Sequence, residues 1–146
     1  MKNLLAATAI ISAFILSSCS KTDIVQDPNA IVGTWQVTDI RSDKPYDWDG
    51  DGFSETDIFG NYSYCQRDIV LVFEQGGYGQ SRQGCNSYWQ NMYWQLGNAN
   101  RTLLISLPGD ELNLDLIQFS QGTIRGEDQV YINGEYFYIT YTLSRR

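Results

Sequence analysis

Residues 47–57 hold the densest set of metal-binding side chains in the sequence, in the order Asp-Trp-Asp-Gly-Asp-Gly-Phe-Ser-Glu-Thr-Asp. Alternating aspartates followed by Gly52 match the start of a calcium-binding loop. Ca²⁺ takes about six to eight oxygen ligands, and alternate aspartates in a tight loop can converge on one ion. We therefore expect a structural Ca²⁺ site. The expected ligands are Asp47, Asp49, Asp51, the carbonyl of Phe53, Glu55 and Asp57.

The loop departs from the full calcium-binding pattern at its end. The twelfth position, which is usually a bidentate Glu, is Ile58, and Asp57 lies one place early. No helical pattern flanks the loop, so a helix-loop-helix calcium site is not expected. The alternative is a solvated turn without an ion, because Asp and Gly are also common turn residues.

The sequence lacks the residue that most catalytic sites use. It contains no His, which removes the commonest general base and the Ser-His and Cys-His pairs. Most zinc and haem sites are excluded for the same reason. Paired carboxylates could still hydrolyse glycosides, but the acidic residues outside the loop show no pairing. We expect no catalytic residues and a role other than that of an enzyme.

The charge balance is acidic, with 10 basic and 17 acidic side chains and a net charge of −7. The only basic pair at the end of the chain is Arg145-Arg146. Nucleic-acid binding needs clustered Lys and Arg side chains. A nucleic-acid partner is therefore not expected.

The first of the three cysteines, Cys19, ends an apolar segment that follows Lys2. A short basic start, an apolar run over residues 4–16 and small residues before the cleavage point are typical of a secretory signal. Leu-Ser-Ser-Cys at its end resembles the bacterial lipobox. The resemblance implies a signal peptide over residues 1–18, a lipid on Cys19 and an outer-membrane lipoprotein of the cell envelope. The facing, periplasmic or surface, stays open.

The other two cysteines, Cys65 and Cys85, form an even pair in what would be an oxidising compartment. A disulfide between them would close a loop and could add roughly 3 kcal/mol in the chain-entropy model. The alternative is two separate buried thiols.

Alternating apolar and polar residues indicate strand after strand once residues 19–30, a polar tether, have passed. We expect one domain over residues 31–146 with a long loop at 42–64. The expected strands cover residues 33–38, 68–74, 78–83, 88–96, 102–107, 111–119, 123–132 and 135–143. Hairpin-length turns, including Asn133-Gly134, join most of them. This pattern predicts an all-β, eight-stranded antiparallel up-and-down barrel, in which closure removes exposed strand edges.

Aromatic residues are abundant, with 4 Trp, 10 Tyr and 6 Phe. They could line a hydrophobic or sugar-stacking pocket. The candidates are Trp35, Tyr88, Trp89, Tyr93 and Trp94. The alternative is a structural role, since aromatic side chains are favoured in strands and barrel cores.

Gly33 and Trp35 at the start of the first strand form a Gly-x-Trp sequence, which is similar to the lipocalin signature. The Asp/Gly-rich loop, Cys65, Asp68, Phe73 and Gly76-Gly77 follow in the order found in lipocalin-like lipoproteins of the Bacteroidetes type. The resemblance implies a lipocalin-like barrel, in which an Arg near the last strand packs on the first-strand Trp. Arg145 is the candidate for that role.

Two functions follow from these observations. The first is a membrane-anchored protein that binds a small hydrophobic or amphipathic molecule in the barrel. The second is a module of the cell envelope that binds a protein or a glycan, as an inhibitor or accessory subunit with a filled core. A cavity inside the barrel would favour the first function, and a filled interior would favour the second.

Overall fold

The computed structural model describes residue 25 and residues 27–85 and 88–146. The expected signal peptide and Cys19 lie outside the described residues. The elements are η1 (Pro28–Ile31), β1 (Gly33–Tyr46), β2 (Glu55–Asp57), α1 (Ile58–Asn61), β3 (Ile69–Phe73), η2 (Gln75–Gly77), β4 (Tyr78–Gln83), β5 (Gln90–Gly97), β6 (Thr102–Leu107), β7 (Asp110–Phe119), β8 (Thr123–Ile132) and β9 (Glu135–Arg145). Within this part of the chain, no helix has the length and hydropathy needed to cross a membrane.

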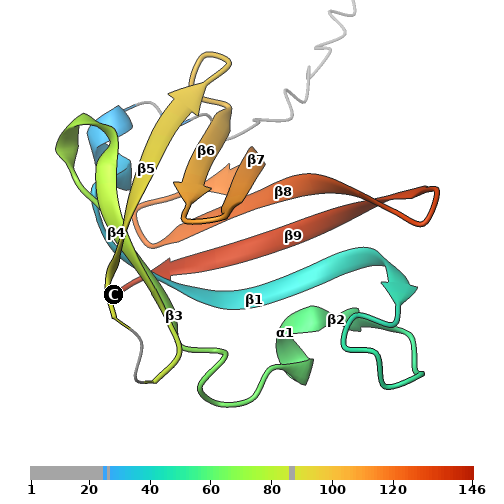
Figure 1. Cartoon of the computed structure of the whole chain (residues 1–146). Coiled ribbons are helices and arrows are strands. Elements are labelled where there is room, and N and C mark those ends of the chain that lie inside the picture. Colours follow the sequence, from blue (N-terminus) through green and yellow to red (C-terminus); the bar gives the residue numbers. More distant parts are fainter. Residues whose placement is uncertain (1–24, 26, 86–87) are drawn as a thin grey trace, which may run out of the picture.

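Eight strands form a closed antiparallel barrel (Figure 1). Strands β3 to β9 pair in sequence order, and β1 closes the ring because it pairs with both β3 and β9. Strand β2 adds to the far end of β1. The predicted fold class, an eight-stranded antiparallel up-and-down barrel, is confirmed.

Strand β1 is longer than predicted. The expected loop at 42–64 begins too early, because β1 continues to Tyr46 and pairs with β9 as far as Ser42 and Ile139. The register shifts between Val37 and Asp39, as at a β-bulge, and such a bulge interrupts the alternation of apolar residues on which the prediction rested. The later part of the expected loop contains β2 and the single turn α1.

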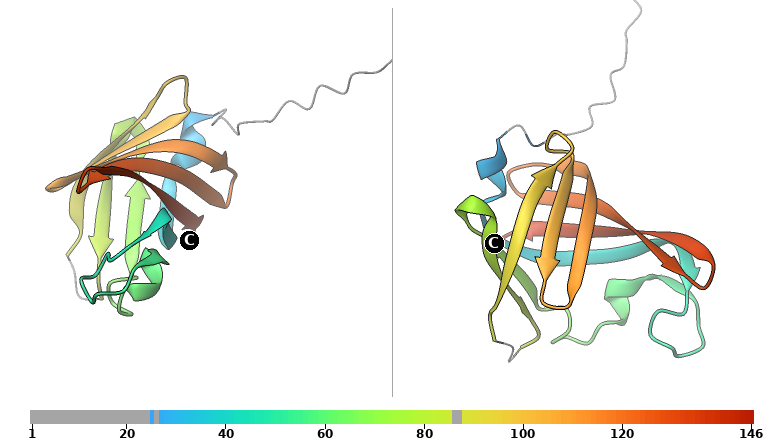
Figure 2. Two further views of the ribbon diagram at one scale, coloured as in Figure 1. Left: turned by 90° about the vertical axis from the view of Figure 1, so that its right-hand side faces the viewer. Right: turned by 45° about the horizontal axis from the view of Figure 1, so that its top comes forward.

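The expected tether over residues 19–30 is also shorter than predicted. Val25 is fully buried, and its carbonyl accepts a hydrogen bond from Asn100 Nδ2 at 3.1 Å. Asp27 caps η1 by accepting a hydrogen bond from the backbone N–H of Asn29. In Figure 2, η1 lies at one end of the barrel and α1 at the other. We call these the closed end and the open end.

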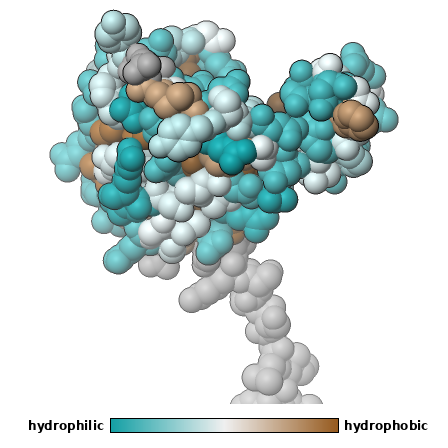
Figure 3. Space-filling view, turned by 90° about the horizontal axis from the view of Figure 1, so that it is seen from below, coloured by the Kyte–Doolittle hydropathy of each residue, from teal (hydrophilic) through white to brown (hydrophobic). Residues whose placement is uncertain are grey.

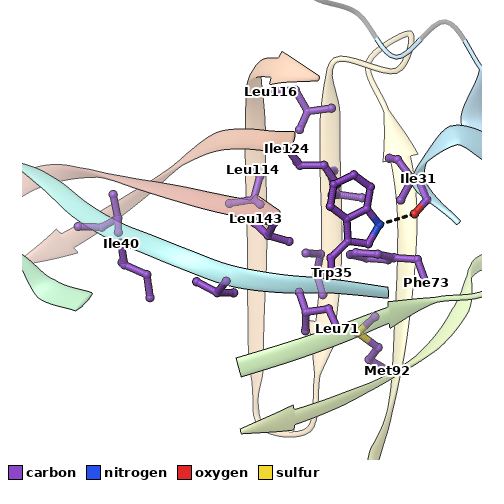
Figure 4. Close-up of a cluster of buried hydrophobic side chains, with 14 of the residues drawn as sticks. Ile31, Trp35, Ile40, Leu71, Phe73, Met92, Leu114, Leu116, Ile124 and Leu143 are labelled. Carbon is purple, nitrogen blue, oxygen red and sulfur yellow. Dashed lines mark hydrogen bonds between the residues drawn. The ribbon is translucent and has the colours of Figure 1, made fainter. Parts of the chain in front are cut away.

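The closed end is filled by apolar side chains around Trp35 (Figure 4). Trp35 has no exposed surface, and its indole Nε1 donates a hydrogen bond to the carbonyl of Ile31 at 2.7 Å. Phe73 packs edge-on against Trp94, with ring centroids 5.6 Å apart. Apolar side chains from successive strands complete this core. They include Met92, Leu103, Ile105, Leu114, Ile124 and Leu143.

Strands β8 and β9 extend beyond the barrel as a long hairpin (Figure 1). Viewed from below in Figure 3, a lobe projects from the main body on the side where the hairpin and the 47–57 loop lie. Tyr46, Trp48 and Phe137 pack edge-to-face at the base of this projection, with centroids 5.0–5.5 Å apart. This small aromatic cluster holds the end of β1 against β9.

Candidate functional site

A cavity of about 170 Å³ opens at the end of the barrel opposite η1. Its apolar wall is supplied by Ile69 and Leu71 of β3 and by Leu107 at the end of β6. The remaining lining residues are Ser81, Arg82, Gln83, Gln90, Pro108 and Asp110. The cavity therefore combines an apolar surface with several polar groups, as small-molecule sites do.

Strand register explains why the interior is open here and filled at the other end. Leu71 pairs with Ser81, and Ser81 pairs with Gln90, so these three side chains share the inner face. One step toward the closed end on the same face, Phe73 lies across from Gly79 and Gly79 lies across from Met92. Large apolar side chains thus occupy the closed end, whereas smaller or polar ones leave space at the open end.

An acidic and a phenolic group, Asp128 and Tyr141, lie near enough to Asp110 of the cavity lining for its charge to act on both. Burial raises the pKa of the Asp128 carboxyl, and neighbouring Asp110 and Asp115 raise it further, while backbone N–H groups act in the opposite direction. Burial also raises the pKa of Tyr141, and the charge of Asp128 adds to that effect. Both groups consequently favour their neutral forms more than they would in water.

The rim of the cavity is braced by a disulfide and an ion pair. Cys65 and Cys85 are bonded, with Cα atoms 4.9 Å apart, which confirms the predicted pairing. Arg82 Nη2 lies 2.8 Å from Asp68 Oδ2, and the Arg82 guanidinium lies 5.2 Å from the ring centroid of Trp89. The Arg82 Nε atom is buried and has no hydrogen-bond partner among the described residues.

The five aromatic residues predicted to bind a ligand do not come together. Trp35 and Trp94 belong to the closed-end core, and the Trp94 Nε1 donates to the carbonyl of Tyr78 at 2.8 Å. Tyr93 is exposed and its ring packs on that of Tyr78, with centroids 5.5 Å apart. Trp89 is about half exposed, and Tyr88 is 89% exposed. These residues do not form one pocket.

The predicted calcium ligands divide into two groups. Carboxylate oxygens of Asp47, Asp49 and Asp51 lie within 4.8 Å of one another. Glu55 instead accepts from the backbone N–H of Trp48, at 3.2 Å. Asp57 accepts from the backbone N–H of Gly60 and lies 3.4 Å from Arg41 Nη2.

The hydrogen bonds of the loop also fit the alternative of a plain turn. Asp47 accepts from the backbone N–H groups of Gly50 and Gly52, and Asp51 accepts from that of Phe53. With one oxygen from each, the three carboxylates supply fewer than the about six to eight oxygens that Ca²⁺ takes. Water or backbone carbonyls would have to supply the remainder.

A second hollow, of about 510 Å³, lies at the closed end beside Arg145 and Asp27. The Arg145 side chain is already committed there, since it donates to the carbonyls of Gln121, Val32 and Ala30. This hollow is open to solvent and lies outside the barrel, so the open-end cavity is the better candidate site.

Sequence reasoning missed the residues that shape the open end. Ser81 and Gln83 lie at inward positions of the predicted strand at 78–83, and Gln90 lies at an inward position of the predicted strand at 88–96. Polar side chains at inward positions of an otherwise apolar barrel are the signal that could have identified them. Asp128 gave the same signal within the strand at 123–132.

A protein-family match and a structural likeness connect the chain to known proteins. Residues 15–142 match a family model described as "Domain of unknown function (DUF5004)". Among curated proteins, none matches at a significant level.

Bovine odorant-binding protein is similar in structure to this chain, in its complex with undecanal and in its complex with its natural ligand. In both cases the identity is 12%, the TM-score is 0.47, and the match covers 83% of this chain and 74% of the other. The likeness concerns the fold and carries no conclusion about a ligand.

Proposed function

Since the chain belongs to the DUF5004 family, whose description assigns no activity, we propose a function from the barrel itself: it binds a small amphipathic molecule at its open end. The apolar part of the ligand contacts Ile69, Leu71 and Leu107. Its polar part faces Gln83, Gln90 and Asp110. Binding without chemical conversion is the simplest role for this site.

The cavity of about 170 Å³ carries this proposal. It is smaller than the about 300–1,000 Å³ of pockets that enclose drug-sized ligands. It therefore accommodates a small molecule or one end of a longer one. The polar lining fixes the orientation of a ligand, because a buried polar group without a partner would be costly.

A fluorescence titration tests the site. An uncharged apolar naphthylamine dye should bind to the protein, and straight-chain alcohols of increasing length should displace it. Ser81→Phe fills the cavity and should weaken dye binding by at least about tenfold. Gln80→Phe places the same ring on the outer face of β4 and should leave binding unchanged.

A second variant separates loss of the site from loss of the fold. Leu107→Ala enlarges the cavity, so longer alcohols should displace the dye more effectively from this variant than from the wild type. Unchanged binding by both Ser81→Phe and Leu107→Ala would show that the dye binds elsewhere and would overturn the proposal.

We propose in addition that Cys19 carries lipid and holds the domain at the outer membrane. The apolar segment before Cys19 and the small residues next to it support this proposal. Labelling cells with an alkyne fatty acid should mark the wild-type chain and leave Cys19→Ser unmarked. Equal labelling of both chains would contradict it.

We also propose a structural Ca²⁺ ion at Asp47, Asp49 and Asp51, which would relieve the repulsion among their carboxylates. Calorimetric titration with CaCl₂ should give saturable heat in the wild type and none in Asp49→Asn/Asp51→Asn. Glu135→Gln, which removes one charge at the hairpin tip, is the control. Absence of heat in the wild type would leave the loop as a plain turn.

A further inference from the structure

Strands β7 and β8 separate before either of them ends. Their ladder stops at the pair Asp115 and Glu127, yet β7 begins at Asp110 and β8 continues to Ile132. Among the described residues, no strand pairs with the outer edge of residues 128–132 of β8. Figure 1 shows this part of β8 running along the edge of the projecting hairpin.

The corresponding edge of β9 is covered. Beyond the last β1–β9 pair, Asp43 Oδ1 accepts from the backbone N–H of Tyr138 at 2.9 Å. Lys44 Nζ donates to the carbonyl of Tyr136, also at 2.9 Å. Side chains of β1 therefore satisfy the edge of β9 after the ladder has ended.

The edge of β8 is less protected, since among the described residues a single side chain, that of Asp128, reaches its backbone. Residues 129–132 are Gln-Val-Tyr-Ile. They include neither a charged residue nor a Pro, the two residue types that commonly protect natural strand edges. The Asp128 carboxyl accepts hydrogen bonds from the backbone N–H groups of Asn113 and Gln129, at the point where the ladder ends. Val130 and Ile132 pack partly buried against the core on the inner face.

The gap between the two strands is acidic. Asp110, Glu111 and Asp115 lie on the β7 side, and Glu127 and Asp128 lie on the β8 side. The ion pairs among the described residues join Arg41 or Arg82 to other carboxylates, and none involves these five. Arg125, the nearest basic residue along β8, lies within the paired part of the ladder, opposite Gln118.

From the unpaired edge and its charge we propose that β8 is a docking strand for an extended basic peptide of a partner protein. The peptide adds a strand along residues 129–132, so its backbone pairs with the backbone groups of β8 that lie beyond the hydrogen bond between Asp128 and Gln129. Its apolar side chains face Val130, Ile132 and Leu112, and its Lys or Arg side chains meet the carboxylates of the gap. This inference is independent of the cavity ligand.

The test uses the full chain and a synthetic heptapeptide that alternates Lys and Val. Amide hydrogen exchange with and without the peptide should show new protection within residues 128–132. Calorimetry should show binding that weakens by at least about tenfold when alternate backbone nitrogens of the peptide are methylated, because methylation removes the hydrogen bonds of one edge. A peptide with Glu in place of Lys should not bind.

Variants of the protein test the charge requirement. Asp115→Asn, in the gap, should weaken binding of the Lys-Val peptide, and Glu74→Gln, an exposed residue outside the gap, should not. If the methylated peptide binds as tightly as the unmethylated one, the interaction is general charge attraction without strand pairing, and the proposal is overturned. Protection of residues 128–132 that rises with protein concentration alone would show a second copy as the occupant and would also overturn it.

Discussion

The guanidinium of Arg145 lies over the ring of Trp35, with its Cζ atom 4.5 Å from the ring centroid. This is the contact that the resemblance to lipocalins implied. Its Nε donates to the carbonyl of Gln121 at 2.7 Å and its Nη1 donates to that of Val32 at 3.1 Å. A Cβ at Gly33 would lie 2.5 Å from Nη1, so the glycine leaves room for the arginine. One side chain thereby ties three segments together at the closed end.

Replacing Arg145 with Ala should lower the free energy of unfolding by about 1–3 kcal/mol, because a cation–π contact and several hydrogen bonds are lost. Urea unfolding followed by tryptophan fluorescence measures this change. Arg146→Ala is the matched control, since that side chain is exposed and its backbone N–H makes the bond to Thr34. Equal effects of the two variants would contradict the role assigned to Arg145.

Gly79 should tolerate no side chain. A Cβ there would lie 2.2 Å from the carbonyl oxygen of Val72 and 2.8 Å from Met92 Cε. Gly79→Ala should therefore destabilise the fold by about 1–3 kcal/mol or more, as overpacked cores do. Gly122→Ala, where nothing lies within 4 Å, is the control and should change the midpoint of thermal unfolding little. A Gly79→Ala protein as stable as the control would show that β3 and β4 separate easily.

The Cys65–Cys85 disulfide should stabilise the domain by about 3 kcal/mol in the chain-entropy model. Reductant should lower the denaturant midpoint of the wild type and leave that of Cys65→Ser/Cys85→Ser unchanged. The bond joins the segment before β3 to the segment after β4. Reduction should therefore weaken dye binding at the open end as well as lower the stability. Unchanged dye binding after reduction would show that the disulfide does not shape the cavity.

Asp128 should make stability depend on pH. Its pKa in the folded state is raised above the ordinary value of 3.8, so the folded chain holds the proton more tightly than the unfolded chain. This contribution to stability is fully present below 3.8 and is lost as pH rises through the folded pKa. Asp128→Asn should consequently be more stable than the wild type at neutral pH.

Unfolding curves at several pH values measure this difference. The gap between Asp128→Asn and the wild type should close in acid, where the wild-type carboxyl is protonated. A gap of the same size at low pH would mean that the carboxylate acts through its shape and hydrogen bonds and not through its charge.

Periodicity predicted the barrel because each strand has one buried face. Leu71 and Phe73, or Ile139 and Leu143, alternate with outward residues over enough positions to define a strand. The end of β1 was not predictable in this way, since the shift between Val37 and Asp39 breaks the alternation. Its length depends on pairing with β9, which is about a hundred residues away in the sequence.

The site was less predictable than the fold. Trp94 was expected to contact a ligand, but aromatic residues in strands indicate only that a side chain is favoured there. The cavity depends on which strands place small and polar residues at the same height of the barrel, as Ser81 and Gln90 do. That alignment is a property of the register, and a single sequence does not give it.

Burial of Val25 fixes where the chain leaves the barrel, at the end occupied by η1 and the turn at Asn100. Val25 is six positions after Cys19 in the sequence, and an extended chain over six positions spans at most about 20 Å. With lipid on Cys19, the domain would sit close to the bilayer with η1 toward the headgroups. The cavity and the free edge of β8 would then face the aqueous side, where a ligand or a partner can approach without crossing the membrane surface.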